Sequence, residues 1–113
     1  MCRFQYLYNG EDGYVVRCHY CGNYQLAFAS IMLTLTENEY RSFCDLVKYK
    51  CDTAYEAAAS ETSKCIVLPT PAPGTFILLT RDEAARMGTM LDDADNENKA
   101  LMLMNLFNEQ NKS

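Results

Sequence analysis

One pattern of residues occurs twice in this chain and limits the folds that the chain can adopt. In each copy, two apolar, strand-like runs lead into Thr-x-x-Glu, which opens an apolar helical face. The matching residues, each pair 44 positions apart, are Cys21 and Cys65, Leu35 and Leu79, Thr36 and Thr80, and Glu39 and Glu83. The shared register predicts a strand–strand–helix unit used twice, although any two units of this kind share much of the pattern.

The Thr-x-x-Glu motif is a signal for the start of a helix. Its threonine oxygen accepts a hydrogen bond from an amide of the first turn, and its glutamate accepts one from the amide of the threonine. Apolar residues at helical spacing follow both motifs. The sequence therefore predicts helices over about 37–49 and 81–93.

Aromatic and β-branched residues dominate the N-terminal segment 3–18, and Asn, Gly and Asp residues interrupt them in the middle. This composition predicts a β-hairpin. If Tyr8 faces Gly13 across the turn, Arg3 lies opposite Cys18. A second hairpin is expected to turn at Ala29 and Ser30, although these are not the strongest turn residues.

The chain has 113 residues, which fits one domain with a single core. The predicted order is a hairpin at 3–18, a first strand–strand–helix unit at 21–50, a linker at 51–63, a second unit at 64–94 and a C-terminal helix at 95–109, helical over about 97–108. Prolines at 69, 71 and 73 mark a strand end and a loop in the second unit. The expected fold is α+β, with a mostly antiparallel sheet of three hairpins and the helices on one face.

The charge pattern argues against nucleic acid as a partner. The formal net charge is −5, and no cluster of Lys and Arg occurs, whereas phosphate neutralisation normally needs a basic surface. The sequence shows no secretory signal and no apolar run of roughly 20 residues, the length that spans a bilayer. We therefore expect a cytoplasmic protein that does not enter membranes.

The stretch Cys-His-Tyr-Cys-Gly at 18–22 is the clearest candidate for chemistry. A Cys-x-x-Cys turn supplies two of the four ligands of a structural zinc site, and a glycine after the second cysteine suits such a turn. Cys2 is the expected third ligand because the first hairpin brings it beside Cys18 and Cys21. Cys65 is the expected fourth by the internal repeat, and His19 is its competitor.

Two other interpretations of the cysteines stay open. They can be structural thiols without chemistry, as expected for Cys44 on an apolar helix face and for Cys51, which has no obvious partner. They can also form a redox pair, but Cys-x-x-Cys redox motifs ordinarily begin a helix, whose dipole lowers the thiol pKa. Here the pair precedes a predicted strand, which makes redox exchange the least favoured of the three.

The C-terminal helix carries more apolar residues than one face can hold. Leu103, Met104 and Phe107 are the residues expected to contact a partner if part of this helix is exposed. The alternative is that the helix packs into the core on two sides, as apolar stripes usually do.

Enzymatic motifs are few. The chain has one histidine and no glycine-rich phosphate loop, and the acidic run at Asp92, Asp93 and Asp95 is typical of a solvated helix end. We therefore expect a protein that is not an enzyme.

Several short motifs occur together in an order that resembles a known group of proteins. They are Cys18-x-x-Cys21, Gln25-Leu26-x-Phe28, Leu35-Thr36 with Glu39, and Ile66-x-Leu68-Pro69. Over nearly its whole length the chain resembles an uncharacterised family of small cytosolic proteins from Bacteroidetes, which often has glycine where this chain has Ala29. The family has no assigned activity, so the resemblance implies the fold outline and the cysteine pair alone.

These observations favour a small non-enzymatic interaction or structural module that binds a protein partner or itself, with zinc as a possible stabilising ion. The alternative function is a thiol-based redox or metal-handling protein.

Overall fold

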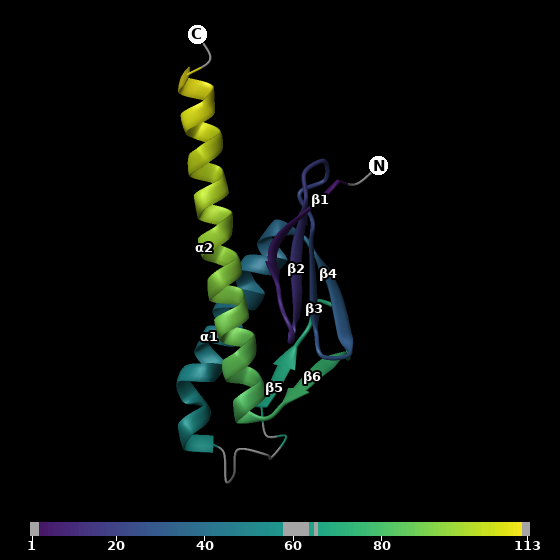
Figure 1. Cartoon of the computed structure of the whole chain (residues 1–113). Coiled ribbons are helices and arrows are strands. Elements are labelled where there is room, and N and C mark those ends of the chain that lie inside the picture. The colour runs from purple at the N-terminus through teal and green to yellow at the C-terminus, as the bar shows by residue number, and fades with distance from the viewer. Residues whose placement is uncertain (1–2, 58–63, 65, 112–113) are drawn as a thin grey trace.

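The structure is a computed structural model that describes residues 3–57, 64 and 66–111. It shows an α+β fold built from a four-stranded sheet, a two-stranded sheet and two helices. In Figure 1 the two helices lie beside the larger sheet, and the C-terminal part of the second helix projects beyond the sheet. The predicted fold class is confirmed.

The larger sheet is an antiparallel meander with the strand order β1-β2-β3-β4. Its strands are β1 (Phe4–Asn9), β2 (Gly13–Cys18), β3 (Tyr24–Phe28) and β4 (Ile31–Leu35). Buried residues alternate along β3, where Tyr24, Leu26 and Phe28 face the core. The opposite face is mixed: Tyr6 and Met32 are exposed there, whereas Val16 and Cys18 are buried.

The pairing of the first hairpin differs from the prediction by two residues beside the turn, where Tyr8 pairs with Val15 instead of Gly13, and by one residue at the other end. Phe4, rather than Arg3, lies opposite Cys18, and the register shifts at a bulge between Tyr6 and Tyr8. The reason is local. Asn9 pairs with Tyr14 and the Gly10 amide donates to the Gly13 carbonyl, so the turn lies one residue later in the chain than predicted. This shifts the pairing beside the turn by two residues, and the bulge takes up one of them.

The second hairpin turns at Ala29 and Ser30, as predicted, because Phe28 pairs with Ile31. Ala29 adopts a left-handed backbone with φ of 54°. This conformation is unusual for a residue with a Cβ atom, and short hairpin turns normally assign it to glycine or asparagine.

The third hairpin forms its own sheet from β5 (Ile66–Pro69) and β6 (Phe76–Leu79). One face of this hairpin enters the core through Ile66, Leu68, Ile77 and Leu79. The alternate residues Val67 and Leu78, which pair across the strands, remain exposed together with Phe76.

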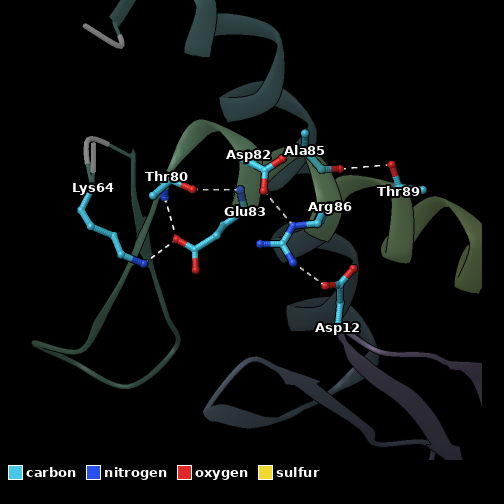
Figure 2. Close-up of polar contacts among 8 residues, drawn as sticks. All are labelled: Asp12, Lys64, Thr80, Asp82, Glu83, Ala85, Arg86 and Thr89. Atoms are coloured by element: carbon cyan, nitrogen blue, oxygen red, sulfur yellow. Dashed lines mark hydrogen bonds and ion pairs between the residues drawn. The ribbon is translucent and has the colours of Figure 1, made fainter. Parts of the chain in front are cut away.

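Both predicted capping boxes are present. Before α1 (Glu37–Ala57), the Glu39 amide donates to Thr36 Oγ1 and the Thr36 amide donates to Glu39 Oε1. Thr80 and Glu83 repeat this arrangement before α2 (Arg81–Asn111), as Figure 2 shows. The ββα order therefore occurs twice, as β3-β4-α1 and β5-β6-α2.

The helices are longer than the sequence predicted. α1 continues to Ala57, so the first part of the predicted linker 51–63 is helical, while 58–63 lies outside the described residues. α2 is one helix, not the predicted pair at 81–93 and 97–108. Its acidic and Asn-rich middle contains no glycine or proline, and burial of Ala94 together with the side-chain contacts of Asn98 holds this middle in place.

Polar contacts fix the start of α2 to the rest of the domain. Lys64 pairs with Glu83, and Arg86 Nη1 lies 2.6 Å from Asp12 Oδ1 in the loop between β1 and β2 (Figure 2). These contacts also lower the pKa of Glu83, chiefly through the Lys64 hydrogen bond, and raise that of Arg86, chiefly through Asp12.

Candidate functional site

The Cys18–Cys21 segment forms a tight turn between β2 and β3. The Gly22 amide donates to the Cys18 carbonyl at 3.0 Å, and the Cys21 amide donates to Cys18 Sγ at 3.5 Å. Gly22 is left-handed, with φ of 76°, so glycine suits this position. An amide directed at the first sulfur is the geometry in which a cysteine turn stabilises a thiolate.

The two sulfur-bearing residues of this turn lie in different surroundings. Cys18 is fully buried, whereas Cys21 and the neighbouring His19 are exposed. Cys18 pairs with Phe4 and shares its sheet face with Val16, while the helices cover the face that carries Val15. The predicted ligand pair therefore sits at a sheet end, away from the helix-covered core.

The other predicted ligands, Cys2 and Cys65, lie outside the described residues. Within the described part of the chain, no three His, Cys, Asp or Glu side chains come together in an arrangement that holds a metal ion. The predicted zinc site therefore stays a prediction.

A groove of about 910 Å³ runs between α1 and α2. Cys44 and Cys51 of α1 contribute thiols to it, and Asp92 and Asp95 of α2 contribute carboxylates. Burial raises the pKa of the Cys44 thiol to about 11, and nearby carboxylates add to the shift. The pKa of Cys51 is also raised, mainly by burial, and its thiol donates to the Ala84 carbonyl.

This groove is poorly suited to thiol chemistry, because a raised pKa keeps both sulfurs protonated near neutral pH. Cys44, which the sequence placed on an apolar helix face, is half-buried, and Cys51 has a partner that the sequence did not indicate. The partner was missed because Ala84 belongs to the other helix and is brought near only by the tertiary packing.

An exposed apolar surface covers the last described turns of α2. We call it the C-terminal patch, and its residues are Met102, Leu103, Met104, Leu106 and Phe107. Between 49% and 67% of each residue is exposed. Of the two alternatives for the C-terminal helix, the structure therefore shows exposure and not core packing for Leu103, Met104 and Phe107.

The patch faces away from the body because the apolar side of α2 changes along its length. Its core stripe includes Ala84, Met87, Leu91 and Ala94, and the same stripe continues through Asn98 and Leu101 to Asn105 and Asn108. Conversely, the positions two turns before Met102, Leu103, Met104 and Leu106 hold Asp95, Asn96, Glu97 and Lys99. Residues seven apart share a helix side, so the patch occupies the side that faces solvent earlier in the helix.

The comparison with protein families covers residues 1–111. The chain belongs to DUF6686, a family of unknown function. This confirms membership of an uncharacterised family over nearly the whole chain, while the Bacteroidetes origin and the cytosolic location stay predictions. No curated protein and no solved structure matches this DUF6686 chain. Across the part of the chain that the structure describes, neither helix has the length and apolar character needed to cross a bilayer.

Proposed function

We propose that this protein is a small non-enzymatic interaction module that binds another polypeptide through the C-terminal patch of α2. The observation that carries the proposal is the change of apolar side along α2, which leaves five large apolar side chains in water. Contiguous exposed apolar surface of this kind is typical of interaction sites, whereas single exposed apolar residues are ordinary.

The position of the patch supports the same function. Among the residues of α2 whose burial the structure describes, Leu101 is the last that packs against the core, and each residue from Met102 to Asn108 is exposed. Figure 1 shows this part of α2 projecting past the sheet. A partner therefore reaches the patch without displacing any described element.

The two thiols in the groove between α1 and α2, those of Cys44 and Cys51, support a non-enzymatic role. At neutral pH both thiols are protonated, because burial raises their pKa values, and protonated thiols are weak nucleophiles.

The test places a photoreactive amino acid at position 103 and, as a control, at the exposed position 93 on α2. We expect irradiation in cells to give a discrete polypeptide adduct from position 103, either with a second copy or with another protein. Position 93 should give none, and adding Phe107→Asp should abolish the adduct. No adduct from position 103, or equal adducts from both positions, would overturn the proposed function.

A structural zinc ion at Cys18 and Cys21 is a second candidate property. It is favoured by the Cys21 amide directed at Cys18 Sγ and by the left-handed Gly22. Elemental analysis of protein purified without chelator, with Cys21→Ser as the comparison, tests it. One zinc per chain that is lost in Cys21→Ser is expected, and a metal-free native protein would refute it.

A further inference from the structure

We infer that the partner of the C-terminal patch is a second copy of this chain, bound as an antiparallel pair of α2 helices with its twofold axis near Leu103. This inference rests on the proposed function and names the partner. In such an isologous contact, both copies use the same surface: residue i of one copy contacts residue j of the other, and residue j contacts residue i. Because the patch contains no charged residue, a twofold contact places apolar side chains against apolar side chains.

The area of the patch matches what a dimer needs. Five half-exposed Met, Leu and Phe residues each offer on the order of 100 Å². Pairing two patches then buries roughly 1,000 Å² in total, close to the lower limit of specific interfaces. Polar neighbours at the rim, such as Lys99 and Asn105, add to this area.

The charges of α2 determine the direction of the pairing. Asp92, Asp93, Asp95 and Glu97 lie just before the patch. A parallel pair would align these carboxylates with their copies and would bring the two folded bodies to the same end. An antiparallel pair moves the two acidic segments away from each other and puts the bodies at opposite ends, so it reduces the first penalty and removes the second.

The net charge of −5 per chain predicts how the dimer responds to salt. Two acidic copies repel each other, and salt screens that repulsion while leaving apolar contact intact. The dimer should therefore tighten several-fold between 50 and 500 mM NaCl, on the order expected for screening within a Debye length. A contact held together by ion pairs would weaken instead.

The experiment measures the mass of the full chain by sedimentation velocity from low micromolar to submillimolar concentration. We expect a reversible species of twice the 12.9 kDa chain mass. Leu103→Asp should weaken it at least tenfold. Ala85→Asp is the matched control, because it adds the same charge on the same exposed side of α2, five turns earlier, and should leave dimerisation unchanged.

Photo-crosslinking within a mixture of isotopically light and heavy chains then tests the geometry. Position 103 of one copy should crosslink to residues 102–107 of the other. Crosslinks to Val67 or Leu78 on the exposed face of β5 and β6 would overturn the antiparallel pair. A monomer at every concentration would also overturn it, and a cellular adduct from position 103 with another protein would then leave the proposed function standing.

Discussion

The ring of Tyr24 in β3 lies parallel to the ring of Tyr40 in α1, with 4.0 Å between the ring centroids. Both side chains are buried, but their hydroxyl groups differ. Tyr24 Oη accepts a hydrogen bond of 3.2 Å from the Asn98 amide of α2. The Tyr40 hydroxyl finds no partner of normal geometry among the described residues, and its polar neighbour is the Cys44 thiol, a weak acceptor.

Removing each hydroxyl should therefore have a different result. Tyr24→Phe leaves the Asn98 amide without its partner and should lower the free energy of unfolding by about 1 kcal/mol. Tyr40→Phe removes a buried polar atom without a normal hydrogen bond and should be neutral or slightly stabilising. Urea unfolding of both variants checks this, and equal losses would show that the two hydroxyls are equivalent.

The raised pKa of Cys44 predicts how stability depends on alkaline pH. The folded thiol has a pKa of about 11, whereas an unfolded cysteine titrates near about 8.5. The folded state thus holds its proton more tightly, so this contribution is intact below about pH 8 and is lost as pH rises towards 11.

Cys44→Ala should make the free energy of unfolding fall less steeply between pH 8 and 10 than in the unchanged chain. Cys21→Ala is the control, because Cys21 is exposed, and it should keep the steep fall. Urea unfolding at pH 7, 8, 9 and 10 measures the slopes. Parallel slopes for the unchanged chain and Cys44→Ala would contradict a raised pKa at Cys44.

The elements that the sequence predicted well have local signals. Thr36 and Thr80 mark their helix starts by residues within one turn, and the turn at Ala29 and Ser30 lies between two continuous apolar runs. Such signals depend on short-range hydrogen bonding and on side-chain periodicity, so they can be read without knowledge of the tertiary structure.

The features that the sequence did not predict depend on distant residues. The continuity of α2 depends on Asn98 reaching Tyr24, which lies 74 positions away along the chain. The thiol of Cys51 meets Ala84 only after the helices pack. The exposure of Leu103 depends on which side of α2 packs against the rest of the domain. The apolar composition of this helix alone does not tell whether Leu103 lies in the core or on the surface.

Gly13 is required by the close approach of two strands. A Cβ atom on this residue would lie 1.8 Å from the Ala27 carbonyl oxygen, which is a backbone atom and cannot rotate away. Gly13→Ala should therefore lower the free energy of unfolding by at least about 1–3 kcal/mol, the usual range for overpacking, because the contacted atom belongs to the backbone.

Gly88→Ala is the comparison for this variant. Its added Cβ would meet only Cys51 Sγ, at 3.1 Å. Alanine also favours a helix over glycine by about 1 kcal/mol, which offsets that contact. Thermal or urea unfolding should show a change within about 1 kcal/mol for Gly88→Ala. A loss as large as that of Gly13→Ala would mean that the helix contact is as rigid as the strand contact.

Ala29 offers a stabilising substitution. Its left-handed backbone costs about 1 kcal/mol for a residue with a Cβ atom, and glycine adopts it freely. Because glycine also gains freedom in the unfolded chain, the net gain for Ala29→Gly should be about 0.5 kcal/mol. The neighbouring Ser30 does not have a positive φ, so Ser30→Gly should instead destabilise by a similar amount. Urea unfolding of the two variants should give changes of opposite sign, and a loss of stability in Ala29→Gly would show that the turn is not strained.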